Sequence, residues 1–389
     1  MTKQELYVMQ KAIRDEYLDG WLFYNFHHRD TLSDAILGLP TDSTNSRIWV
    51  CAVSTSAEPL KIVHAIETSI LDKVPGMTIV YQSREEFIAA LKGLAGGRWG
   101  VHVSDTLPAI SFLDAGLAHT FEAAGLGLCS AAGLVQRFKG LLDTEGIASH
   151  ERAARHLYDM VALAWERVRV AYALHQPLCE GDIRGLFLDE MHRRGLICDH
   201  SPIVGAGVNS GNPHYDFSGA GTTFVQGDVI QFDLWAKEAT PDAIYADISW
   251  VGIFARDVPP RVAQAFTDLV SAREGAYRFI AECFSAEKRA LSGADVDRKT
   301  RELLISMGYA SALKHRTGHG IDTEVHGSGV NMDSVEFPDS RPLLEGSCFS
   351  LEPGLYFADF GLRTEIDVYI ENGKPVVSGK DRQFNILTC

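Results

Sequence analysis

The chain has 389 residues, a hydrophobic content of 46% and a formal net charge of −15 at pH 7. This length and composition are enough for two domains with buried cores. The acidic charge argues against nucleic acid or an anionic membrane as the main partner. No apolar run is long enough to span a bilayer, and residues 1–20 are typical of an amphipathic helix and not of a signal peptide. The seven scattered cysteines, with no C-x-x-C pair, favour free thiols in a reducing cytoplasm.

The first 143 residues alternate between strand-like and helix-like segments. Stretches rich in β-branched and aromatic residues predict strands at GWLFYNF, SRIWVCAVS, LKIVHAI, MTIVYQS and RWGVHVS. Helices are expected at residues 2–19, 83–94 and 108–118. The alternation predicts a small α/β domain over residues 1–143. The stretches LCSAAGL and LLDTEG place the linker near residues 128–146.

From residue 144 onward, the order of two helices followed by strands occurs twice. Apolar spacing predicts a long helix that Thr144 caps and that ends before Pro177, then a shorter helix over residues 182–194 and strands over 201–252. The second copy has a long helix over residues 259–284, a shorter one over 294–307 and strands from residue 315 to the end. This repetition predicts a degenerate internal duplication in a second domain, residues 144–389.

Four carboxylates and one imidazole lie in distinctive local patterns in this second part. The patterns are VIQFDLW for Asp233, IYADISWVG for Asp247, RTGHGIDTEVH for His319, FSLEPG for Glu352 and GLRTEIDVYI for Glu365. Residues 229–235 and 362–370 are each expected to form a single strand. Side chains on a strand alternate between its faces, so each strand has an apolar back and a polar front that carries a carboxylate. Four buried carboxylates without cations would be very costly. Carboxylates with one imidazole suit two divalent ions.

These motifs resemble the metallopeptidase family of the pita-bread fold, in its Xaa-Pro aminopeptidase, prolidase and creatinase branch. The resemblance rests on GHGI followed by a second His, on SLEPG, and on a Glu two residues after an Arg. It covers residues 145–389 strongly and residues 1–143 weakly, as a creatinase-like amino-terminal domain. It implies a pita-bread catalytic domain with a pseudo-twofold axis, and an α/β (α+β) fold overall.

The resemblance also implies a set of metal ligands. Asp233 would bind one ion, Asp247 and Glu365 would bridge both ions, and His319 and Glu352 would complete the second position. Manganese is the first choice for the two ions, and cobalt, zinc and iron remain open because ligand chemistry does not separate them.

Further residues receive roles next to these ligands. His214, in GNPHYDF, and His326 match the family's substrate-side histidines, which stabilise the tetrahedral intermediate. Glu352 would be general base and acid as well as ligand. Arg363 shares a strand face with the last carboxylate and is expected to pair with a carboxylate, and Ser249 keeps a hydroxyl that the family has.

Some polar residues receive no part in the chemistry. His192, His200 and His315 have no ligand-like context and are assigned surface or packing roles, and Asp367 is expected to support the ligands. Three departures from the family leave the exact substrate open: Trp250 where the family has Arg, Gly327 after the second His, and a longer hairpin loop at Lys237–Asp242.

The function that follows is a dinuclear metallopeptidase that hydrolyses the bond before proline with a metal-bridging water. Its substrate would be a small peptide with proline in second position, and the enzyme would be a cytoplasmic homodimer. One alternative is a creatinase-like or other small-molecule C–N hydrolase or lyase on the same fold. Another is a non-catalytic binding protein, against which the retention of all five ligands argues.

Overall fold

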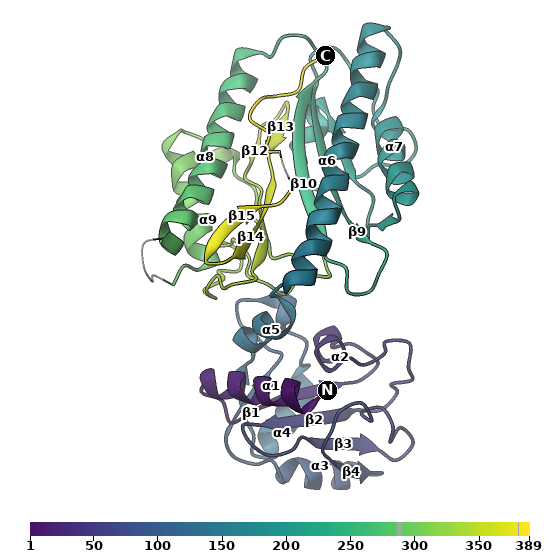
Figure 1. Cartoon of the computed structure of the whole chain (residues 1–389), viewed down its shortest axis with the longest axis vertical. Helices are drawn as coiled ribbons and strands as arrows, with labels where there is room; N and C mark the ends of the chain where they lie inside the picture. Colours follow the sequence, from purple (N-terminus) through teal and green to yellow (C-terminus); the bar gives the residue numbers. More distant parts are fainter. Residues whose placement is uncertain (286–289, 380) are drawn as a thin grey trace. The chain divides into compact units, whose positions relative to one another are not determined.

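The computed structural model describes residues 1–285, 290–379 and 381–389. The chain divides into two compact units, Met1–Lys139 and Gly140–Cys389 (Figure 1). No helix within these described ranges is long and apolar enough to cross a membrane.

A six-stranded sheet in the order β4-β3-β2-β1-β5-β6 forms the centre of the first unit. The strands β1 and β2 and the strands β2 and β3 pair antiparallel, whereas the other neighbours pair parallel. Their bounds are Gly20–Asn25 (β1), Trp49–Ser54 (β2), Leu60–His64 (β3), Met77–Tyr81 (β4), Arg98–Val101 (β5) and Gly127–Ser130 (β6). All five predicted strands are present, and β6 was not predicted as a strand.

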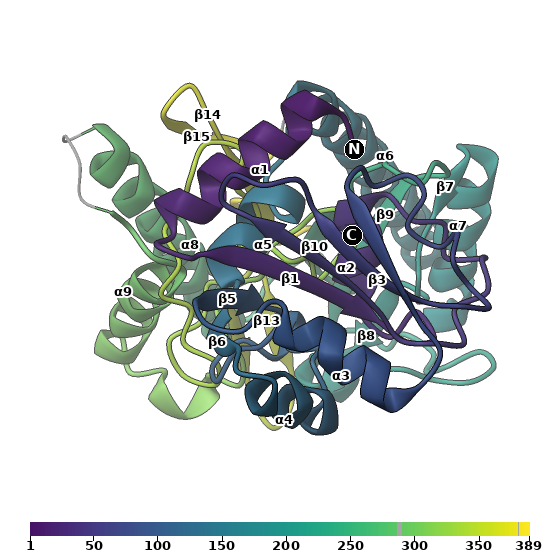
Figure 2. The same ribbon diagram turned by 90° about the horizontal axis from the view of Figure 1, so that it is seen from below.

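Helices cover both faces of this sheet (Figure 2). One face packs against α1, α2 and α5 and the other against α3 and α4. Alternation along β1 explains this, because Trp21 and Phe23 enter one core and Leu22 and Tyr24 enter the other. The bounds are Lys3–Asp15 (α1), Thr31–Leu37 (α2), Arg84–Lys92 (α3), Pro108–Ile110 (η1), Ala115–Ala123 (α4) and Ala132–Lys139 (α5).

The first unit differs from expectation in some details. The helix expected at residues 108–118 is the short turn η1 followed by α4. The boundary between the two units lies after Lys139, within the linker range expected near residues 128–146, and the part of that range up to Lys139 is ordered as β6 and α5 of the first unit. The helix α2 was not predicted. It begins after the buried Asp30, whose carboxylate accepts a hydrogen bond from the Ser33 backbone N–H at 2.9 Å.

The second unit repeats one order of elements, as predicted. In Figure 1 the pair α6 and α7 and the pair α8 and α9 lie on opposite sides of the strands. The first set is α6 (Thr144–Ala173), α7 (Glu180–Arg193), β7 (Leu196–Ile197), β8 (Ile203–Ala206), η2 (Gly207–Gly211), β9 (Val229–Glu238) and β10 (Ala246–Ile253). The second is α8 (Pro260–Ser285), α9 (Gly293–Ser306), η3 (Ala310–Ala312), β11 (Cys348–Leu351), β12 (Gly354–Tyr356), β13 (Gly361–Arg363), β14 (Ile366–Glu371) and β15 (Lys374–Val377).

The strands described in the second unit form three sheets. β9 pairs with β7, β8 and β10, β14 pairs with β11 and β15, and β12 pairs with β13. The single strand expected over residues 362–370 is therefore two strands, because the chain passes from one sheet to another between Arg363 and Ile366. At this crossing, the Glu365 N–H donates to the Ser249 carbonyl of β10 at 3.2 Å.

Two other expectations for this unit were also wrong. Asp143 and not Thr144 caps α6, because the Asp143 carboxylate accepts a hydrogen bond from the Gly146 N–H at 2.8 Å. Among the described residues between α9 and Cys348, no named strand forms, although strands were expected from residue 315. Buried carboxylates hold this irregular segment: Asp297 accepts from Thr317 and Ser334, and Asp333 accepts from three backbone N–H groups.

Candidate metal and substrate site

The pairing of β9 with β10 places acidic and hydroxyl side chains on one face. Asp233 lies opposite Ser249 and Asp247 lies opposite Trp235. The alternate residues of β9, among them Phe232 and Leu234, are buried against α6 and α7. The predicted apolar back and polar front of this strand are therefore present.

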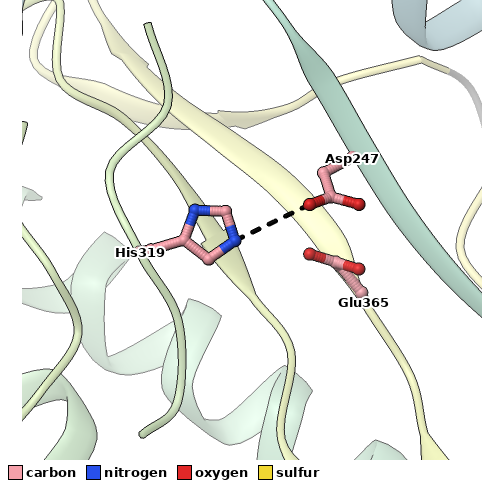
Figure 3. A group of neighbouring side chains, drawn as sticks. All are labelled: Asp247, His319 and Glu365. Atoms are coloured by element: carbon pink, nitrogen blue, oxygen red, sulfur yellow. Dashed lines mark ion pairs between the residues drawn. The ribbon is translucent and has the colours of Figure 1, made fainter. Parts of the chain in front are cut away.

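Three of the five predicted ligands form one compact group (Figure 3). Ligand atoms of Asp247, His319 and Glu365 all lie within 4.8 Å of one another, and all three side chains are buried. The distance from His319 Nε2 to Asp247 Oδ2 is 3.6 Å. Asp247 comes from β10, Glu365 from the crossing between β13 and β14, and His319 from the irregular segment before β11. The His319 backbone is held there by Ser350 Oγ, which accepts from its N–H at 3.0 Å.

The other two predicted ligands lie at the edge of this group. Glu352 Oε1 is 3.3 Å from His319 Nε2, and Glu352 Oε2 is 3.9 Å from Arg363 Nε. Asp233 is turned toward Arg363, with which it forms an ion pair, and its other oxygen accepts from Ser249 Oγ at 2.5 Å. The expected pairing of Arg363 with a carboxylate is therefore present, and Asp233 stands outside the group of three.

Buried carboxylate oxygens that lack a hydrogen-bond partner indicate whether divalent ions fit in this group. Asp247 Oδ1 and both carboxylate oxygens of Glu365 are buried without a hydrogen-bond partner. Burial, with repulsion from neighbouring carboxylates, raises the pKa of both side chains well above the ordinary value. Buried polar atoms in proteins nearly always have a partner, and a cation supplies one while it removes the repulsion. The residues present fit divalent metal.

Glu352 differs from these carboxylates. Burial acts to raise its pKa, but His319 and Arg363 outweigh burial and hold the pKa below the ordinary value. Burial in turn lowers the pKa of His319. A carboxylate that stays ionised at this position can accept a proton or a cation.

A model of metallopeptidase family M24 matches residues 150–372, which is more than half of the chain. The chain belongs to metallopeptidase family M24. The fold agrees with this, because the recombinant prolidase from Thermococcus sibiricus superposes with a TM-score of 0.68 at 20% identity, covering 100% of both chains. The expected pita-bread fold is thereby confirmed.

Named relatives are similar in sequence to part of this chain. The chain is 30% identical over 165 residues to the Xaa-Pro dipeptidase of Lactobacillus delbrueckii subsp. lactis. This match covers 42% of this chain and 40% of that protein. It is 26% identical over 296 residues to the probable dipeptidase PepE of Mycobacterium tuberculosis strain H37Rv, and this match covers 76% of this chain and 72% of that protein. The chain thus matches less than half the length of the first of these relatives.

A cavity of about 670 Å³ opens beside the acidic group of this M24 protein. Both histidines predicted on the substrate side, His214 and His326, line it together with Glu352. The His326 ring stands perpendicular to the His319 ring with 4.3 Å between centroids. The nearby His319, with burial, lowers the pKa of His326 to about 4, so its imidazole is neutral at pH 7. The position of both histidines agrees with their predicted place beside the ligands.

Two further residues that were not predicted at the site, His315 and Arg316, also line this cavity. His315 was assigned a surface or packing role. Its Nε2 lies 2.7 Å from the hydroxyl of Tyr356, and burial lowers its pKa to about 4. The sequence offers one signal that His315 belongs to the site, which is its position four residues before His319. The segment has no periodic hydrophobic pattern from which its structure could be predicted.

Two departures from the family pattern have local structural reasons. Trp250 lies on the back of β10, where its ring contacts Tyr158 of α6 at 6.1 Å between centroids, so it does not alter the site. At Gly327 an added Cβ would lie 2.7 Å from the Asp322 carboxylate carbon. This tight turn leaves no room for the acidic side chain that the family often has there.

Asp367 supports the group from behind, as expected. One of its oxygens accepts from the Asp247 N–H at 2.7 Å. Burial, with repulsion from Asp247, raises the pKa of Asp367 well above the ordinary value.

Proposed function

We propose that the protein is a dinuclear, metal-dependent Xaa-Pro peptidase of the aminopeptidase P or prolidase type. The observation that carries this proposal is the buried group of Asp247, His319 and Glu365, in which both carboxylates have unsatisfied oxygens. Asp247 and His319 of this group line the same cavity as His214 and His326. Membership of family M24 and the names of its dipeptidase relatives support the same reaction.

Five residues would hold two divalent ions, with manganese the first choice: Asp233, Asp247, His319, Glu352 and Glu365. The ions, when bound, would polarise the acyl oxygen and lower the pKa of the attacking water. Asp233 would exchange part of its contact with Arg363 for metal, because the two cations compete for the same oxygens. Ser249 and Arg363 would then keep its carboxylate oriented.

The remaining steps belong to side chains of this protein. Glu352 would take a proton from the attacking water and deliver it to the proline nitrogen as the bond breaks. That nitrogen carries no hydrogen in the peptide, so it cannot leave as a secondary amine until it gains one. His214 and His326 would donate N–H groups to the oxyanion that develops on the carbonyl oxygen.

The test is hydrolysis of a small panel by protein that has been stripped with a chelator and then reloaded. Ala-Pro and Ala-Pro-Ala represent the two reaction types, and Ala-Ala is the matched peptide without proline. We expect no cleavage before reloading and cleavage of a proline peptide after reloading with manganese, cobalt, zinc or iron. Full activity of metal-free protein, or cleavage of Ala-Ala alone, would contradict the proposal.

We also propose that the protein is a cytoplasmic homodimer. The argument is the size of the first unit, which is too large to serve as a linker. Light scattering at micromolar concentration should give twice the mass of the chain, and a mass of 42.7 kDa would refute the dimer.

A further inference from the structure

Strand β4 is the last strand of the six-stranded sheet and leaves one edge of that sheet open (Figure 1). Among the strands that the structure describes, β4 pairs only with β3. Three of its apolar side chains are exposed, Met77 by 68%, Ile79 by 37% and Val80 by 49%. Alternation along the strand places Met77 and Ile79 on one face of the sheet and Val80 on the other. Apolar side chains are therefore exposed on both faces of this edge.

The sequence of β4 has none of the features with which proteins usually protect an open edge. Its five residues, MTIVY, include no charged residue, proline or glycine. Its pairing with β3 runs from Met77 to Tyr81 without a bulge. Charges, prolines and bulges usually prevent an open edge from pairing with a strand of another chain. Their absence from this strand indicates that the edge has a partner outside the chain.

Two hydrogen bonds show which backbone groups point toward the open edge. The Met77 N–H donates to the carbonyl of the residue before β3 at 3.0 Å, and the Tyr81 carbonyl accepts from the N–H of the residue after β3 at 2.9 Å. Because backbone groups alternate along a strand, those of Met77, Tyr81 and the residue midway between them point toward β3. The N–H and C=O groups of Thr78 and Val80 point outward, where a further strand can bond to them.

We propose that β4 pairs antiparallel with β4 of a second copy of the chain, about a twofold axis at Ile79, and so joins the two sheets into one. This interface rests on the proposed homodimer and specifies its surface. In this register Thr78 of each copy lies opposite Val80 of the other, so that the outward N–H and C=O groups of both residues are paired. A twofold contact uses the same patch on both copies, which a strand that pairs with itself provides.

The side chains of the strand fit the same register. Ile79 lies opposite its own copy, in the kind of pair without hydrogen bonds in which opposite side chains are closest. Met77 lies opposite Tyr81 on the same face of the sheet, and Thr78 lies opposite Val80 on the other face. The apolar side chains that are exposed in the single chain are thus covered on both faces.

The charges at the ends of β4 favour the antiparallel direction. Asp72 and Lys73 lie just before the strand, Arg84 and Glu85 lie just after it, and all four side chains are exposed. In the antiparallel pair the start of one strand lies beside the end of the other, so Lys73 comes toward Glu85 and Asp72 toward Arg84. A parallel pair would bring like charges together, which opposes association.

The net charge of the chain is a further argument for this edge. Two chains that each carry a net charge of −15 repel each other. The strand β4 brings no charge to the contact, so two copies can approach along it without placing like charges opposite each other.

The experiment uses the position of Ile79 opposite its own copy. Ile79→Lys and Ile79→Glu each place like charges opposite each other, which should raise the Kd of the dimer more than about 100-fold. Light scattering at micromolar concentration should therefore give 42.7 kDa for either variant alone. An equimolar mixture of the two variants places Lys opposite Glu and should restore the dimer.

A second variant and a control separate the contact from the fold. Val80→Pro removes an N–H that points outward and leaves the bonds between β4 and β3 in place, so it should weaken the dimer in a folded protein. Tyr7→Lys is the control, because Tyr7 is an apolar side chain on α1 that is 58% exposed, and it should remain a dimer. Circular dichroism of every variant should match that of the wild type.

Three outcomes would overturn this interface. A dimer that persists unchanged in both Ile79→Lys and Ile79→Glu would refute the pairing of β4 and leave the homodimer itself intact. Variants that are monomeric alone and remain monomeric in the mixture would refute the position of Ile79 on the twofold axis. A monomeric wild type would refute both the interface and the homodimer, while Ala-Pro hydrolysis by the same preparation would still report on the proposed peptidase function.

Discussion

Ser249 lies directly opposite Asp233 in the ladder of β9 and β10, and its hydroxyl donates to Asp233 Oδ1 at 2.5 Å. Arg363 contacts both residues, because its Nε donates to Ser249 Oγ at 3.0 Å and its Nη2 pairs with Asp233. These contacts orient a carboxylate that stands beside the group of Asp247, His319 and Glu365. Ser249 is thus placed to act on metal binding without itself being a ligand.

Ser249→Ala should weaken metal binding while the fold is kept. Loss of a contact that orients a ligand typically lowers metal affinity by about 10–100-fold. Titration of stripped protein with manganese, followed by calorimetry, measures the change. Ser249→Thr keeps the hydroxyl and should remain close to the wild type. Equal affinity in Ser249→Ala and wild type would show that Asp233 needs no such support.

The stability of the metal-free protein should fall as pH rises above about 4, the ordinary carboxyl range. The pKa values of Asp247, Glu365 and Asp367 are raised in the folded protein, so the folded protein holds protons that the unfolded chain releases. The stability that these groups contribute is therefore present at low pH and is lost as the pH rises through their pKa values in the folded protein. Bound metal needs the ionised form, so it should stabilise more at high pH.

Melting temperatures with chelator and with manganese, at about pH 5.5 and pH 8, test this linkage. The gain from manganese should be larger at the higher pH. Glu365→Gln removes one of the titrating groups, so without metal it should melt above the wild type at pH 8 and should gain less from manganese. Equal manganese shifts at the two pH values would contradict the assignment of these carboxylates as ligands.

His214→Ala and His326→Ala should lower kcat far more than they lower metal content. Both side chains line the cavity outside the group of ligands. A positioned donor to an oxyanion contributes about 10²–10³-fold to kcat. His192→Ala, on α7 and outside the residues that line the cavity, is the control. Near-normal turnover of the best proline peptide in both variants would refute their catalytic role.

Glu180 should position the loop that carries His214. It is fully buried, and its carboxylate accepts from the Ala206 and Thr222 N–H groups at 2.9 Å and 2.7 Å and from the Tyr215 hydroxyl at 3.0 Å. Glu180→Gln replaces one acceptor oxygen by a donor and should raise hydrogen exchange over residues 207–222 and lower kcat, with metal content unchanged. Tyr215→Phe removes one contact only and should have a smaller effect. Unchanged exchange in Glu180→Gln would contradict this.

Much of the site could be predicted because it lies on regular strands. Alternation along β9 and β10 places Asp233 and Asp247 on one face, and the apolar residues between them are buried as expected. The prediction that Arg363 pairs with a carboxylate came from its position two residues before Glu365, which places both side chains on the same face of a strand. The alternation of side chains along a strand is what makes these positions predictable. The prediction for Arg363 is correct even though the strand expected over residues 362–370 is broken at the crossing between two sheets.

The remainder depends on contacts far apart in the chain. His315 and Arg316 lie in an irregular segment whose course is set by Asp297, on α9, and not by any local periodicity. Nothing in the local sequence says that Asp233 turns to Arg363. The strand β6 has four residues with little apolar content, so its place in the sheet comes from pairing with β5.

The central claim is that Asp247 and Glu365 hold a pair of ions on which peptide hydrolysis depends. The most direct measurement is metal stoichiometry by mass spectrometry together with Ala-Pro turnover, on the same preparations of wild type, Glu365→Ala and the exposed control Glu336→Ala. We predict about two ions per chain in the wild type, loss of metal and of turnover together in Glu365→Ala, and two ions in the control. A Glu365→Ala protein that cleaves Ala-Pro at the wild-type rate, or a fully active wild type without metal, would contradict the account.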